Sequence, residues 1–189
     1  MKRARANSSE GGLTGGSGDV NPQFITNSVT QSAADTATST QITLPVQRLP
    51  ESAAKALVME VIRVYFQFPT FGAFAAAGES TDRMTCALST KNFGTTATDM
   101  DEPTVFAISR VVRQGAFTAA GTYGYQESAV LVWECTDGAG HGILIATDAI
   151  YAQCTSTGTG NANQVKFKIL YRWKKVSLAE YIGIVQSQQ

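Results

Sequence analysis

Hydrophobic, β-branched and aromatic residues recur along this chain in short segments, separated by clusters of glycine, serine, threonine, asparagine and proline. Residues of the first group favour extended backbone, whereas those of the second favour turns and loops. From residue 20 onward the alternation predicts eight strands and very little helix. The predicted strands span residues 23–31, 38–47, 56–68, 81–90, 104–113, 125–135, 142–154 and 164–174.

The spacing of these segments favours one architecture. Successive strands begin roughly 20 residues apart, which is longer than the 8–12 residues expected for a simple meander. Long strands joined by substantial loops favour an all-β, eight-stranded jelly-roll (Greek-key) sandwich. Residues 49–56 could form one helical turn, and Asp101-Glu102-Pro103 resembles a helix start ahead of residues 104–113. The valines of that last segment favour strand.

The segment 164–174 has the clearest period of two. Its apolar residues alternate with a set that is mostly basic, so the segment predicts one buried face and one basic face. The apolar set is Val165, Phe167, Ile169, Tyr171 and Trp173, and the other set is Lys166, Lys168, Leu170, Arg172 and Lys174.

The two ends of the chain differ from its middle. Residues 1–19 begin with Lys2, Arg3 and Arg5 and continue as a Gly/Ser-rich stretch, which predicts a disordered basic N-terminal arm. Residues 20–175 would form the jelly-roll domain. Residues 176–189 form an apolar tail that we expect to pack, either on its own sheet or on a neighbouring subunit.

Composition and charge limit the possible partners. Of the 189 residues, 43% are hydrophobic and 16% charged, and the 15 basic residues balance the 15 acidic ones. So low a charged fraction favours a protein whose faces are covered by partners. A net charge of zero means that any nucleic-acid binding must come from local clusters.

Two such clusters are present. Lys2, Arg3 and Arg5 could neutralise phosphates or act in a nuclear-import signal. The second cluster includes Lys166 and Lys168, and it continues with basic residues up to position 175. It could be a solvent-facing strand whose lysines protect an edge, a nucleic-acid contact, or part of a subunit interface. The candidate nucleic-acid-binding residues are thus Lys2, Arg3, Arg5, Lys166 and Lys168.

Catalytic and metal-binding patterns are weak. His141 is the single histidine and lies between glycines, which is typical of a loop residue, and no G-x-S-x-G motif occurs. The three cysteines, at positions 86, 135 and 154, are far apart and predict buried free thiols. Asp99, Asp101 and Glu102 form an acidic loop without EF-hand spacing. We expect no cofactor, no metal and no enzymatic activity.

The sequence shows the pattern of neither a secretory signal nor a membrane-spanning segment. The basic start at residues 1–5 is followed by polar, glycine-rich sequence, not by the apolar segment of a secretory signal. The sequence contains no apolar run long enough to span a membrane. We therefore expect a protein made and kept in the cytosol or nucleus.

The ends and one central segment of the chain resemble a known family. A basic arm leads into eight predicted strands, residues 58–69 read VMEVIRVYFQFP, and the chain closes with LYRWKKVSLAEYIGIVQSQQ over residues 170–189. Together these features resemble the capsid proteins of small circular Rep-encoding single-stranded DNA viruses. They resemble especially the environmental members whose coats are similar to that of satellite tobacco necrosis virus.

The resemblance implies a single jelly roll that self-assembles into a T=1 icosahedral shell of sixty copies around a single-stranded DNA genome. It also implies an inward-facing basic arm, location in the virion, and presence in the host nucleus and cytoplasm during assembly. It does not identify a host receptor. Circovirus-like coats usually have a long arginine-rich arm, whereas here only Lys2, Arg3 and Arg5 are present. Inner-face residues such as Lys166 and Lys168 could share the packaging.

Two other functions stay open. A jelly roll can also be a secreted binding module such as a lectin or a cytokine, although the missing signal peptide and disulfide framework count against this. A cupin-like enzyme is the second alternative. It would need a metal site, which one histidine cannot supply.

Overall fold

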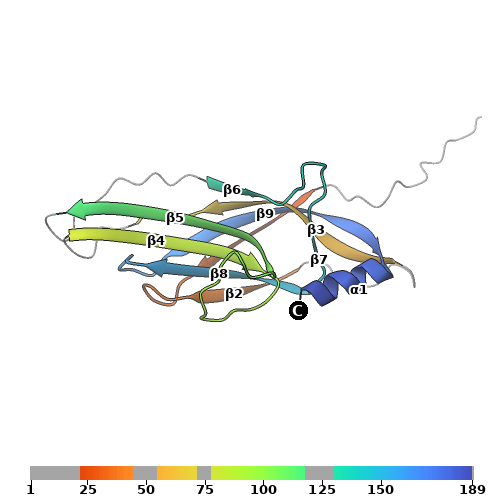
Figure 1. Cartoon of the computed structure of the whole chain (residues 1–189), viewed down its shortest axis with the longest axis horizontal. Helices are drawn as coiled ribbons and strands as arrows, with labels where there is room; N and C mark the ends of the chain where they lie inside the picture. The colour runs from red at the N-terminus through yellow and green to blue at the C-terminus, as the bar shows by residue number, and fades with distance from the viewer. Residues whose placement is uncertain (1–21, 45–54, 72–77, 118–129, 189) are drawn as a thin grey trace, which may run out of the picture.

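A computed structural model describes residues 22–44, 55–71, 78–117 and 130–188, and these form two antiparallel sheets and one helix (Figure 1). In these ranges nine strands precede one C-terminal helix. In chain order they are β1 (Gln23–Thr30), β2 (Thr38–Thr43), β3 (Lys55–Gln67), β4 (Gly78–Ser89), β5 (Val105–Phe117), β6 (Val130–Glu134), β7 (Ile143–Ile145), β8 (Ala149–Thr157), β9 (Gln164–Ser177) and α1 (Leu178–Ser187).

The strand order confirms the predicted jelly roll. The first sheet has the order β1-β9-β3-β6, and the short β7 also pairs with β3. The second sheet has the order β2-β8-β4-β5. Neighbouring strands in each sheet are mostly distant in sequence, since the chain crosses repeatedly from one sheet to the other. Eight strands make the sandwich, and β7 is a three-residue addition to it.

The strand boundaries differ from the predicted ones at one important place. Residues 142–154, expected as one strand, form β7 in the first sheet and β8 in the second. The chain changes sheets in between, where Thr147 Oγ1 donates to the carbonyl of Ala149 and the carbonyl of Asp148 accepts from Leu44 N–H. Apolar residues on both sides of this turn hide it in the sequence. Residues 104–113 are strand, as their valines predicted.

Several expectations fall on other parts of the chain. The basic arm, residues 1–19, lies outside the described residues, as does most of the predicted turn at 49–56. Lys55 and Ala56, which end that segment, already belong to β3.

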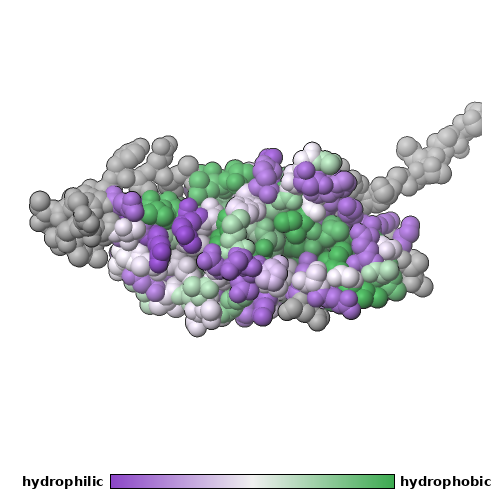
Figure 2. Space-filling view, in the orientation of Figure 1, coloured by the Kyte–Doolittle hydropathy of each residue, from purple (hydrophilic) through white to green (hydrophobic). Residues whose placement is uncertain are grey.

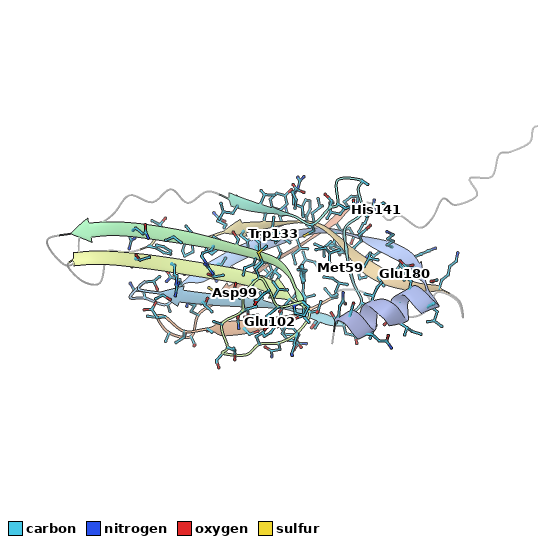
Figure 3. All side chains as sticks on the ribbon, viewed as in Figure 1. Met59, Asp99, Glu102, Trp133, His141 and Glu180 are labelled. Atoms are coloured by element: carbon cyan, nitrogen blue, oxygen red, sulfur yellow. The ribbon has the colours of Figure 1, made fainter. Side chains whose placement is uncertain are left out.

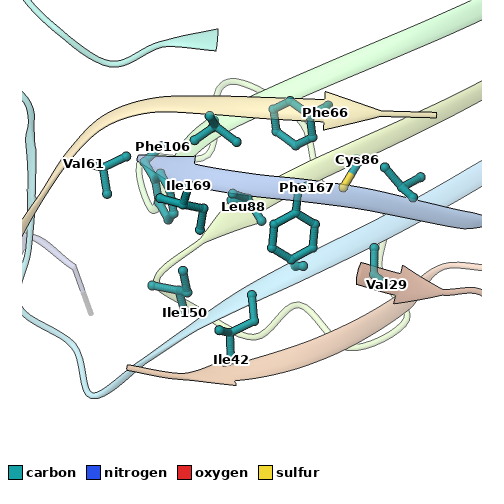
Figure 4. Close-up of a cluster of buried hydrophobic side chains, with 14 of the residues drawn as sticks. Val29, Ile42, Val61, Phe66, Cys86, Leu88, Phe106, Ile150, Phe167 and Ile169 are labelled. Carbon is teal, nitrogen blue, oxygen red and sulfur yellow. The ribbon is translucent and has the colours of Figure 1, made fainter. Parts of the chain in front are cut away.

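The core lies between the two sheets, where side chains from both inner faces meet (Figure 4). Phe66, Phe167 and Ile169 of the first sheet pack with Leu88 and Ile150 of the second. The alternation predicted for β9 is confirmed, because all five residues of its predicted buried set, at every second position from 165 to 173, are at most 3% exposed. The register of β3 shifts between Val61 and Arg63. This bulge allows Val61 and Val64 both to face the core although they are three residues apart.

The three cysteines are free and buried in this core, as expected. Burial raises the pKa of the thiols of Cys135 and Cys154 to about 12, and the negative charge of Glu134 adds to the effect at Cys135. All three are therefore protonated, unreactive core residues at neutral pH.

The C-terminal tail forms a helix that the strand-based reading of the sequence missed. Ser177 caps α1, because its Oγ accepts a hydrogen bond from Glu180 N–H at 3.2 Å. Tyr181, Ile184 and Val185 pack against a small apolar cluster on the outer face of the first sheet. That cluster consists of Ala56, Val58, Ala146 and Val176. The tail thus packs on its own sheet. Among the described residues, no helix is both long and apolar enough to cross a membrane.

The clean separation of the two faces of β9 gives a stability prediction. Phe167→Ala should lower the free energy of unfolding by about 3–5 kcal/mol, because it opens a cavity between the sheets. The adjacent Lys166→Ala should change it by about 0.5 kcal/mol or less, because that side chain is exposed. Urea unfolding followed by tryptophan fluorescence measures both variants. Similar losses for the two would contradict the assigned faces.

Candidate nucleic-acid interface

Lys166 and Lys168 lie on the outer face of the first sheet. Both are exposed, and they are two residues apart on β9, so their side chains leave the strand on the same side. β9 is flanked by β1 and β3, and β6 lies beyond β3. The lysines therefore occupy the middle of a four-stranded surface instead of an edge, and protection of an edge does not explain them.

The register of the four strands arranges the outward side chains in three rows. Each row contains one residue from each of β1, β9, β3 and β6, in that order. The rows are Phe24, Leu170, Arg63 and Glu134; Thr26, Lys168, Tyr65 and Val132; and Ser28, Lys166, Gln67 and Val130. We call these twelve residues the outer patch.

A shallow groove of about 420 Å³ runs over this patch, and three aromatic residues (Phe24, Tyr65 and the buried Phe167) and two lysines contribute to its lining. Phe24 is 50% exposed, which is unusual for so large an apolar ring. The Nζ atom of Lys168 lies 3.8 Å from the centroid of this ring, within cation–π distance. Tyr65 lines the groove from β3. Among the described residues, none that lines the groove carries a carboxylate.

Two other cations of β9, Arg172 and Lys174, have a different role. Glu60, on β3, is fully buried, and its carboxylate accepts hydrogen bonds from Arg172 Nε at 2.5 Å and Lys174 Nζ at 3.2 Å. Its third donor is the N–H of Gly142, at 3.0 Å. Arg172 and Lys174 therefore neutralise a buried acid, whereas Lys166 and Lys168 face solvent.

Glu60 also fixes the loop between β6 and β7 onto the sheet. Arg172 donates a further hydrogen bond to the carbonyl of Gly140 at 3.1 Å. Gly142 approaches so closely that a Cβ atom there would lie 2.2 Å from the carbonyl oxygen of Val61. Burial alone would raise the pKa of Glu60, but the hydrogen bonds from Arg172, Gly142 and Lys174 outweigh burial and lower it.

Sequence analysis missed Glu60, although a signal was present. It is the one carboxylate within the predicted apolar strand 56–68. A charge in such a strand requires partners nearby. The contribution of Phe24 and Tyr65 was also missed, because it depends on which strands are neighbours and on their register.

The other polar residues singled out in the sequence do not gather at one place. His141 is exposed and its Nδ1 lies 2.8 Å from Asp137 Oδ2, and this contact is the main cause that lowers the pKa of Asp137 to about 2. Asp99 and Glu102 belong to the loop between β4 and β5, whereas His141 belongs to the loop between β6 and β7 (Figure 3). Within the described ranges, no three His, Cys, Asp or Glu residues come together to hold a metal ion. Lys2, Arg3 and Arg5 lie outside those ranges.

Comparison with known proteins establishes the fold. No family model and no curated protein matches the sequence. The structure is similar to VP1 of Trichodysplasia spinulosa-associated polyomavirus in complex with sialylated precision glycooligomers, with 10% identity, a TM-score of 0.52, and coverage of 82% of this chain and 95% of that one. It is also similar to apo VP1 of New Jersey polyomavirus, with 8% identity, a TM-score of 0.51, and coverage of 82% and 99%. These neighbours are jelly-roll viral coat proteins.

The buried Glu60 predicts a specific dependence of stability on pH. Because its pKa is lower in the folded than in the unfolded chain, the stability that it provides is present above the ordinary value of 4.5 and is lost as the pH falls through the folded pKa. Glu60→Gln should therefore have a flatter stability curve than the wild type between about pH 6 and pH 3. Urea unfolding across this range measures the difference.

Glu134→Gln is the matched control. Glu134 pairs with Arg63 at 2.6 Å, but both side chains are at least 40% exposed, so its loss should change stability by no more than about 1 kcal/mol. Parallel curves for the wild type and Glu60→Gln would show that Glu60 does not hold the charge assigned to it.

Proposed function

We propose that this chain is a viral capsid protein that self-assembles into a small icosahedral shell, a T=1 particle of sixty copies, around a single-stranded DNA genome. The observation that carries the proposal is the strand order β1-β9-β3-β6 against β2-β8-β4-β5 in a fold similar to that of the VP1 coat proteins. Its role is structural and not enzymatic. The protein resides in the virion, and in the host nucleus and cytoplasm during assembly.

The side of the sandwich formed by β5 and β6 supports self-association. Within the described residues, each of these strands pairs with a neighbour on one side only. Val112 on β5 is about half exposed, at 48%. Figure 2 shows apolar surface over β6. Edges that remain unpaired usually carry lysine or proline, and β6, with the sequence VLVWE, has neither. A second copy of the chain would cover this side.

Two groups of cations support contact with the genome. The arm supplies Lys2, Arg3 and Arg5, and the outer patch supplies Lys166 and Lys168. A single copy with three arm charges would bind weakly, but a closed shell adds many copies together. We propose that the outer patch faces the packaged nucleic acid. Its two lysines would then compensate for the shortness of the arm.

Self-assembly can be tested with two lysine substitutions on opposite sides of the sandwich. The wild type should form uniform spheres in negative-stain microscopy and elute as a large species from size exclusion. Val112→Lys should raise the concentration needed for assembly by roughly tenfold or more, because a charge would have to lose its water at the contact. Gln41→Lys, which adds the same charge at an exposed position of β2, should assemble normally.

The variant and the wild type test different parts of the proposal: the variant tests the subunit contact, and the wild type tests formation of the shell. Normal assembly of Val112→Lys would remove the β5/β6 side from the subunit contacts. A wild-type chain that stays monomeric across protein and salt concentrations would overturn the shell itself. A monomer that binds a glycan would instead favour the lectin-like module.

Removal of residues 1–6 tests the arm separately. Particles should still form, but their nucleic-acid content should fall by roughly half, because three of the five proposed phosphate-binding cations are lost. The ratio of absorbance at 260 and 280 nm measures this content. A full-length variant with glutamine at positions 2, 3 and 5 should behave in the same way. Unchanged content in both would contradict the role of the arm and leave the shell intact.

A further inference from the structure

We infer that the outer patch binds single-stranded nucleic acid through its bases as well as its phosphates. Bases stack on Phe24 and Tyr65, while Lys166 and Lys168 contact the phosphates between them. The inference rests on the proposed function, since it takes this face of the sheet to meet the packaged genome. It goes further by naming the form of nucleic acid and the mode of binding.

The placement of the two rings carries the argument. Phe24 is on β1 and Tyr65 on β3, with β9 between them, so two strand spacings of about 4.8 Å separate their columns. Lys168 stands in the intervening column, in the same row as Tyr65. Its ammonium group lies over the ring of Phe24. An aromatic residue, a cation and a second aromatic residue therefore follow one another across the sheet, with Lys166 one row farther on.

The charges of the patch are arranged to attract an anion. Glu134 is the only carboxylate in the three rows, and it is paired with Arg63. Glu60, also on β3, is paired with Arg172 and Lys174. Among the described residues, no carboxylate forms an ion pair with Lys166 or Lys168. Two positive charges thus remain uncompensated beside exposed aromatic surface.

This combination favours a single-stranded nucleic acid over other partners. In a duplex the base faces are covered by their neighbours, whereas the bases of a single strand can stack on a protein ring. Such stacking tolerates any sequence, because every base has an aromatic face. A protein partner is a poorer match, because lysine is depleted from the buried part of protein–protein interfaces.

Binding of the full-length chain to two fluorescent oligomers of equal length and charge tests the inference. One is oligothymidylate, and the other is an abasic strand with the same number of phosphates. Fluorescence anisotropy should show roughly tenfold or greater preference for oligothymidylate, since only this strand can stack. Phe24→Leu/Tyr65→Leu should remove the preference and leave binding to the abasic strand unchanged.

The lysines should behave differently from the rings. Lys166→Gln/Lys168→Gln should weaken the binding of both strands and reduce the slope of log affinity against log salt by about 1.4, or 0.7 for each lost phosphate contact. The matched control is Lys91→Gln/Phe93→Leu in the loop between β4 and β5, where Lys91 Nζ lies 5.9 Å from the ring centroid of Phe93. This pair should leave both affinities unchanged. Circular dichroism confirms that each variant is folded.

Equal affinity for the two strands, or a preference that survives Phe24→Leu/Tyr65→Leu, would overturn the inference. Particle formation, scored separately by microscopy, distinguishes this from a failure of the proposed function. Uniform particles without the preference would refute stacking and leave the shell standing. The preference in a chain that never forms particles would support stacking and refute the shell.

Discussion

Each strand of this molecule can direct only every second side chain into the space between the sheets, and the rest of the structure depends on that constraint. The inner half of β9 is apolar and buried, and its outer half is left to polar and basic residues. Folding therefore produces the core and the outer patch together, since the register that aligns Phe167 with Phe66 also aligns Lys168 with Tyr65.

The outer face of the first sheet has a covered part around Glu60 and an uncovered part at Lys166 and Lys168. Near α1 the outer side chains of β3 and β9 are covered by the helix and by the loop that reaches Gly142. There the buried carboxylate uses two cations of β9 as structural partners. Farther along the same strand no loop or helix among the described residues covers the sheet, and the lysines remain available. One strand thus contributes both to the stability of the subunit and to the proposed contact with nucleic acid.

Most of the fold could be predicted from the sequence, because strand formation leaves a local pattern. The alternation over residues 164–174 indicated β9 and its buried face, and the valines of residues 104–113 indicated β5. Helix α1 was not predicted, because Tyr181, Ile184 and Val185 give a helical period over only ten residues. The capping pattern from Ser177 to Glu180 would have indicated it. The outer patch could be predicted only in part. Lys166 and Lys168 follow from one strand, but Phe24 and Tyr65 join them through pairings that a single sequence does not reveal.

The last described residue, Gln188, has a consequence for how far the first sheet can extend. Its side-chain amide donates to the carbonyl of Leu144 at 2.6 Å and accepts from Ala146 N–H at 2.9 Å, the two groups that another strand would use to join β7. The side-chain amide of Gln188 takes the place of one peptide unit of a neighbouring strand, but it is not part of a strand with which another strand could pair in turn. Hydrogen bonding along the free edge of β7 is therefore completed by the subunit's own tail, so that no further strand can extend the first sheet from β7.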